Sequence, residues 1–133
     1  MALLLKVDAV ANRPTGTAHG MSGLNLKVFV TDPNGDPYPG LTQEHFKVQA
    51  MDSGNLNIVD VNVGHVSEMH RQDPGRWPAG LYYMDLTIPG GFFADKYYTL
   101  FVQVRRFPVS GRFFAFGRAR PDQGQTMTGI DYR

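Results

Sequence analysis

Apolar side chains recur at every second position in several short segments of the chain. The clearest run has Leu24, Leu26, Val28 and Val30 on one side, with mostly polar residues between them. Because successive side chains of a β-strand point to opposite faces, a period of two predicts a strand with one face in the core. The same reasoning predicts strands over residues 3–10, 24–31, 46–50, 58–66, 80–88, 97–105 and 107–119.

Turn-forming residues separate these segments. The 15 Gly and 9 Pro residues lie mainly between the apolar runs, as in Asp32-Pro33-Asn34-Gly35 and Pro89-Gly90-Gly91. Within Leu41–Phe46, Thr42 suits the cap of a single helical turn, and residues 69–78 suit a loop. Seven to eight short strands with turn signals between them predict an all-β fold, an antiparallel β-sandwich with at most one short helical turn.

The chain has the length of one domain, at 133 residues. We expect residues 1–120 to form the sandwich. Residues 121–133 begin with Pro121-Asp122-Gln123-Gly124, a polar and breaker-rich sequence. Such a composition predicts a polar C-terminal tail.

Two regions resemble bacterial immunoglobulin-like domains of the Big and invasin-like kind. Residues 28–46 contain the pattern D-x-x-G-x-P-x-x-G-L, from Asp32 to Leu41, followed by a strand that begins at Phe46. Gly80-Leu81-Tyr82 and the segment from Tyr98 to Val104 resemble the closing strand pair of that family. Together these regions cover about half of the chain. The resemblance implies an immunoglobulin-like sandwich of seven to eight strands, a fold that serves as stalk, adhesive module, spacer or assembly subunit.

The composition excludes several classes of functional site. The chain is 42% hydrophobic and 19% charged, which is typical of a folded domain. It has no cysteine, and this excludes disulfides, a thiolate nucleophile, zinc ribbons and iron–sulfur sites. The net charge of +1 is unevenly divided, with six basic and ten acidic residues in 1–95 and seven basic and two acidic residues in 96–133.

The N-terminus carries no recognisable targeting signal. The apolar stretch Met1–Leu5 is followed at once by Lys6 and Asp8, so it is too short for a secretory signal. We therefore expect a cytoplasmic protein by default, and an extracellular one only by a non-classical route or as part of an assembly. Apolar runs are also too short to predict a membrane-spanning helix.

Candidate metal sites have ordinary structural explanations. Asp32, Asn34 and Asp36 offer oxygens at alternate positions, but Gly35 and the neighbouring prolines are typical of a turn. On a strand, Glu68 and His70 would share a face that His65 does not. The sequence has no nucleophile elbow, zinc-protease motif, phosphate loop or dinucleotide fingerprint. We expect no enzyme activity, catalytic residue, metal or cofactor.

Aromatic residues are more numerous than a two-layer core requires, and this favours a contact surface. Trp77, Phe92 and Phe93 lie in predicted loops, where they would act either as exposed anchors or as plugs over the core. Arg105, Arg106 and Arg112 would form the charged rim of such an interface. The predicted function is therefore a non-catalytic structural or protein-interaction subunit, with a protein partner or a second copy as its ligand.

Two other functions use the same residues. A carbohydrate-binding module would need Trp77, Tyr82 or Tyr83 as a flat platform. A nucleic-acid binder would combine the arginines of residues 105–120 with nearby phenylalanines, but five arginines spread over sixteen residues fit a protected strand edge at least as well. The first strand and the C-terminal tail would also be available to pair with a neighbour's edge.

Overall fold

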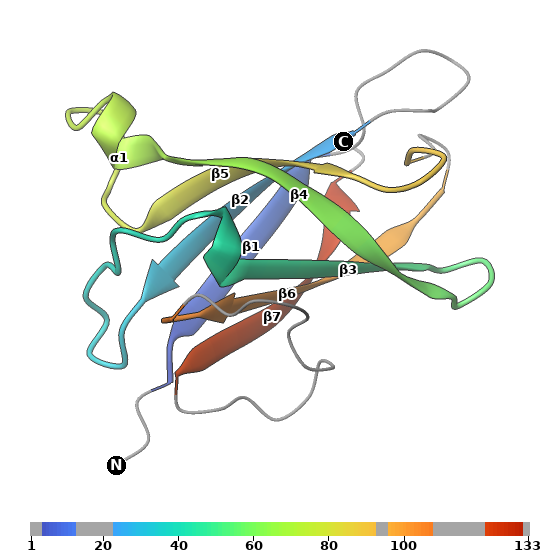
Figure 1. Ribbon diagram of the computed structural model, residues 1–133, viewed down its shortest axis with the longest axis horizontal. Coiled ribbons are helices and arrows are strands. Elements are labelled where there is room, and N and C mark those ends of the chain that lie inside the picture. The colour runs from blue at the N-terminus through green and yellow to red at the C-terminus, as the bar shows by residue number, and fades with distance from the viewer. Residues whose placement is uncertain (1–3, 13–22, 93–95, 108–121, 132–133) are drawn as a thin grey trace.

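The computed structural model describes residues 4–12, 23–92, 96–107 and 122–131, and these residues form an all-β fold (Figure 1). The strands are β1 (Lys6–Asn12), β2 (Leu24–Thr31), β3 (Phe46–Asp52), β4 (Ile58–Glu68), β5 (Leu81–Thr87), β6 (Tyr98–Arg105) and β7 (Gln123–Asp131). A 3₁₀ turn, η1 (Gln43–His45), precedes β3, and a short helix, α1 (Met69–Gln72), follows β4.

The strands form a nearly closed sheet in the order β1-β2-β5-β4-β3-β6-β7. Neighbours in this order pair antiparallel, as predicted. The ring closes between β1 and β7, which run parallel and pair Ala11 with Ile130 and Asn12 with Asp131. These two strands therefore pair with each other, although we expected both chain ends to be available for a neighbour's edge.

β4 connects the two halves of the sheet. Its first residues, from Ile58 to Val61, pair with β3, whereas the stretch from Asn62 to Glu68 pairs with β5. The register shifts between Val63 and Val66, and a bulge of this kind lets a long strand bend from one neighbour to another.

The predicted alternation is confirmed in the core. Every second residue of β2 is buried, and Tyr82, Met84 and Leu86 of β5 face the same interior. β3 and β6 complete it from the opposite half of the sheet. The largest fully buried core side chains are Leu24, Leu26, Val28, Val30, Val48, Tyr82, Met84, Leu86, Phe92, Leu100, Val102 and Val104.

The structure corrects two details and leaves one predicted strand undescribed. The prediction of a polar tail over 121–133 is wrong for residues 123–131, which form β7 and pair with β6 from Gln123 to Gly129. The loop expected at 69–78 begins with α1, so the described residues contain two short helical turns instead of one. The strand predicted at 107–119 lies almost entirely outside the described residues.

β7 lacks a strong apolar pattern, although backbone pairing holds it against β6 and, at its end, against β1. Its residues opposite the core positions Val104, Val102 and Leu100 are Gly124, Thr126 and Thr128, none of them large. Within the ranges that the structure describes, no helix is both long enough and apolar enough to cross a membrane.

Candidate functional site

Phe92 is a core residue, and the expectation that it forms an exposed anchor is wrong. Its side chain is fully buried and packs edge-on against Tyr98, with 5.1 Å between the ring centroids. Phe92 therefore fits the alternative prediction for a loop aromatic, in which the ring packs over the core. Phe93 lies outside the described residues.

Trp77 is partly exposed in the turn that follows α1. The guanidinium carbon of Arg76 lies 4.8 Å from the centre of its ring. Its carbonyl oxygen lies 2.8 Å from Nδ1 of His70. Trp77 thus remains a candidate contact residue, with one ring face occupied by a cation from the same chain.

Of the three arginines expected at the rim, the structure describes Arg105 and Arg106. Arg105 is only 3% exposed, so the prediction that it lies at an exposed rim is wrong. Arg106 is partly buried, and its guanidinium carbon lies 5.4 Å from the ring centre of Tyr38. Arg112 lies outside the described residues, as do Arg118 and Arg120 of the predicted nucleic-acid surface.

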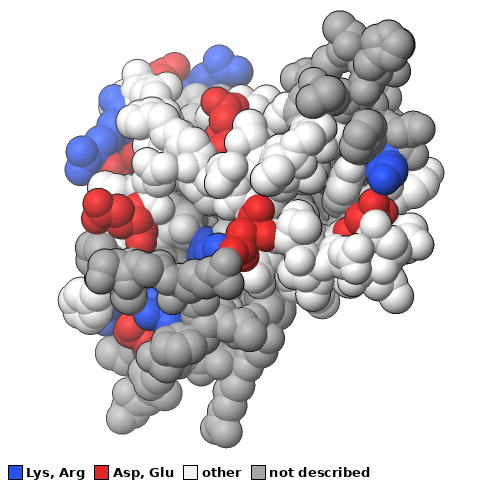
Figure 2. Space-filling view, turned by 45° about the vertical axis from the view of Figure 1, so that its right-hand side comes forward, with Lys and Arg blue, Asp and Glu red and all other residues white. Residues whose placement is uncertain are grey.

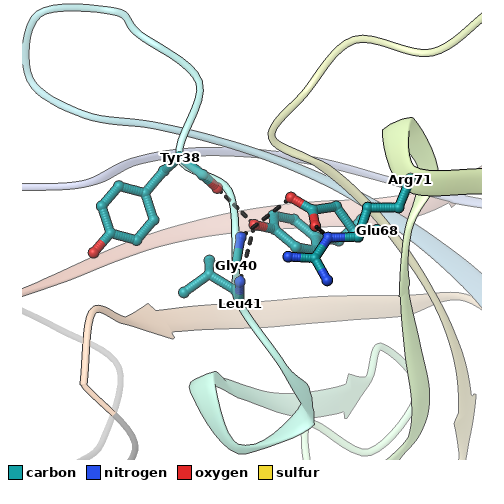
Figure 3. A network of polar contacts seen from close by, with 6 residues as sticks. Tyr38, Gly40, Leu41, Glu68 and Arg71 are labelled. Atoms are coloured by element: carbon teal, nitrogen blue, oxygen red, sulfur yellow. Dashed lines mark hydrogen bonds and ion pairs between the residues drawn. The ribbon is translucent and has the colours of Figure 1, made fainter. Parts of the chain in front are cut away.

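The hydroxyl of Tyr82 ties the β2–β3 connection to the core (Figure 3). It donates to the carbonyl of Tyr38 at 2.6 Å and accepts from the backbone N–H of Leu41 at 3.2 Å. Burial raises the pKa of Tyr82 to about 12. Because its ring is fully buried, Tyr82 is excluded from a carbohydrate platform.

Glu68 fixes the same connection from β4. Its Oε1 accepts from the backbone N–H of Gly40 at 3.1 Å, and its Oε2 lies 2.7 Å from Nε of Arg71 (Figure 3). A hollow of about 290 Å³ lies beside these residues. Both carboxylate oxygens of Glu68 therefore already serve structural bonds, and the hollow is also lined by His65, Ser67 and Thr42.

The candidate metal ligands also have structural partners. The Asp32 carboxylate accepts from the backbone N–H groups of Asn34 and Asp36, at 2.9 Å and 3.0 Å, as in an Asx turn. Glu68 is bonded to Arg71, and His70 contacts Trp77. Among the described residues, no three His, Cys, Asp or Glu side chains are grouped to hold a metal ion.

An exposed apolar surface occurs at the turn between β3 and β4, which projects at the right of Figure 1. We call residues 52–59 the hairpin arm. It exposes Leu56 by 66%, Ile58 by 55% and Val59 by 42%. The face of Figure 2 that carries this end of the molecule has wide uncharged areas between few charged groups. From its sequence this region was expected to be only a strand and a turn. The signal for exposed apolar residues was the adjacent pair Ile58-Val59, which breaks the period of two.

The tip of the hairpin arm is tightly hydrogen-bonded. The carbonyl of Asp52 accepts from the N–H of Leu56 at 2.7 Å, and the carboxylate of Asp52 accepts from Gly54 at 2.8 Å and pairs with Lys96 at 3.2 Å. The hydrogen bond from Gly54 and then the contact with Lys96 lower the pKa of Asp52. Within this turn Leu56 has a φ of +60°, the left-handed region that favours glycine and asparagine.

A shallow groove lies along one side of the hairpin arm. This arm groove has a volume of about 510 Å³ and is lined by Gln49, Ile58, Val59, Asp60, Ile88 and Pro89. Its one acidic group, Asp60, lies 3.0 Å from Nζ of Lys47 and accepts from the side chain of Gln49. The groove therefore presents apolar side chains and an ion pair whose charges balance.

Comparisons of the chain with protein-family models, with curated proteins and with solved structures find no match.

Proposed function

We propose that the protein is a non-catalytic immunoglobulin-like module that acts as a structural or protein-interaction subunit of a larger assembly. The observation that carries the proposal is the hairpin arm, where Leu56, Ile58 and Val59 are exposed on a hydrogen-bonded turn. Exposed apolar groups gathered on one projection are typical of surfaces that bury against another protein.

The strand order supports the immunoglobulin-like part of the proposal. Immunoglobulin constant-type sandwiches place four strands in the order A-B-E-D in one sheet and C-F-G in the other. With β1 to β7 taken as A to G, the observed order divides into β1-β2-β5-β4 and β3-β6-β7, the same two sets. An experimental structure in which these sets form two facing layers would agree, whereas an open-centred barrel would contradict this part.

The polar network around Tyr82 and Glu68 has a structural role, which fits a non-catalytic module. Its bonds to Tyr38, Gly40 and Leu41 hold the β2–β3 connection in place. Two of the three rings named for the carbohydrate alternative do not favour it, since Tyr82 is buried and Trp77 lies against Arg76, whereas Tyr83 is partly exposed.

The proposal is tested by affinity capture of the full chain from extracts of its source cells after cross-linking. We expect a defined protein to be recovered with the wild type, and to be lost with Ile58→Asp, because a charge would be buried in the contact. Val10→Asp is the matched control, since Val10 is 59% exposed on β1, away from the arm. Equal recovery with both variants, each folded by circular dichroism, would contradict the role of the arm.

A further inference from the structure

We propose that the hairpin arm docks against the hairpin arm of a second copy of this chain, with Leu56 of each copy seated in the arm groove of the other. The inference rests on the proposed function and names the partner for the same surface. Three observations carry it: the backbone of Leu56, the position of the arm groove, and the charges around it.

In the isolated chain, both the backbone conformation of Leu56 and the exposure of its side chain are unfavourable. Its left-handed backbone would suit glycine or asparagine better, and its side chain is 66% exposed to water. The turn fixes this conformation through the bonds of the Asp52 backbone to Leu56 and Asn57. A contact that buries the side chain would account for a leucine here, because a rigid, pre-positioned apolar group loses little entropy when it binds.

The arm carries both halves of a self-complementary contact. Leu56 projects at the tip, and the arm groove begins two residues later at Ile58. A two-fold interface requires that a surface patch bind an identical patch, residue i against residue j and j against i. Two arms lying antiparallel meet this requirement, since the tip of each reaches the groove of the other.

The charges favour an identical copy over a charged partner. Asp52 pairs with Lys96, and Asp60 pairs with Lys47, so the ionised groups that the structure describes at the arm are balanced within one chain. Two such surfaces meet without like-charge repulsion, whereas a strongly acidic or basic partner would find no net charge to complement. The small size of an arm predicts a weak, concentration-dependent dimer.

Sedimentation analysis of the full chain across a range of concentrations measures the dimer. We expect a reversible monomer–dimer equilibrium, with a dissociation constant raised at least about tenfold by Leu56→Asn. Asparagine accepts the left-handed backbone, so the urea midpoint of this variant should not fall. Val10→Thr, which alters an equally exposed valine on β1, should leave the equilibrium unchanged.

Cross-linking tests the arrangement, because the chain has no cysteine of its own. A mixture of Leu56→Cys and Pro89→Cys copies should give cross-linked dimers with a short bifunctional maleimide. A mixture of Val10→Cys and Pro89→Cys copies should give none. Equal yields from the two mixtures would overturn the arrangement in which Leu56 of one copy lies in the arm groove of the other.

A wild type that stays monomeric at every concentration, or a dimer that Leu56→Asn does not weaken, would overturn the inference. Neither result would by itself contradict the proposed function, which the Ile58→Asp capture experiment tests separately. A dimer that is weakened by Leu56→Asn and cross-links through positions 56 and 89 supports the inference even when the capture experiment recovers no other protein.

Discussion

The hydroxyl of Tyr82 acts as both donor and acceptor inside the fold. It bonds the carbonyl of Tyr38 and the N–H of Leu41, which belong to the connection between β2 and β3. The raised pKa of about 12 follows mainly from burial, so the neutral phenol is the form that the folded state favours. Together with Glu68, this one atom holds a loop that has no ladder partner over most of its length.

Tyr82→Phe should lower the free energy of unfolding by about 1–3 kcal/mol, because it leaves a buried N–H and a carbonyl without their partner. Urea unfolding followed by circular dichroism measures the loss. Tyr83→Phe is the matched control on the same strand, at a partly exposed position, and we expect a change of less than about 0.5 kcal/mol. Equal losses for both variants would contradict the role assigned to Tyr82.

At the scale of elements, the turn of the hairpin arm depends on the charge of Asp52. Its pKa in the folded state lies below the ordinary value of 3.8. A lowered pKa means that the stabilisation is fully present above 3.8 and is lost as the pH falls through the folded value.

Asp52→Asn removes this charge while it keeps an acceptor for Gly54. We expect the variant to be less stable than the wild type at about pH 7, and the difference to shrink towards zero at about pH 2. Urea unfolding at both pH values provides the measurement. A difference that is as large in acid as at neutral pH would show that the carboxylate charge does not support the turn.

The closure between β1 and β7 depends on Gly124. A Cβ there would collide with the carbonyl oxygen of Leu5 and lie 2.7 Å from Cγ2 of Val7. Gly124→Ala should therefore separate the strands and cost about 1–3 kcal/mol in unfolding free energy. Gly129→Ala is the control on the same strand, since a Cβ at Gly129 meets nothing within 4 Å. Equal stability of the two variants would contradict the close approach of β1 and β7.

Sequence patterning predicted the elements that face the core with large apolar side chains, and it missed those held by backbone pairing. β2, β5 and β6 follow the period of two, because their buried positions are filled by leucine, valine, methionine and tyrosine. β7 has glycine and threonine at the corresponding positions, so its composition resembles that of a tail.

The contact surface was harder to predict than the fold. Phe92 and Arg105 were expected to be exposed, but burial depends on which distant residues pack over a loop or strand face, and one sequence does not specify this. Leu56 gave no signal, because its left-handed backbone arises from the hydrogen bonds of the whole turn.

At the scale of the whole molecule, ring closure limits where a partner can bind. Each of the seven described strands has neighbours on both sides in the ring. Exposed backbone edges are the usual route to strand addition, and closure protects against it. Side chains on a projection such as the hairpin arm are then the natural means of association, and this is why the proposals depend on Leu56 and Ile58 instead of on a chain terminus.

Closure also predicts that removing β7 affects the entire fold. A chain that ends at residue 121 would lose the seven register pairs between β6 and β7 and the parallel neighbour of β1. Since Leu100, Val102 and Val104 of β6 belong to the central core, opening that edge should abolish the cooperative thermal transition measured by circular dichroism. A chain that ends at Asp131 keeps β7 and serves as the control. If both truncated chains melted like the full chain, residues 123–131 would be the dispensable tail that their composition suggests, and the sheet would have to be stable without its closing strand.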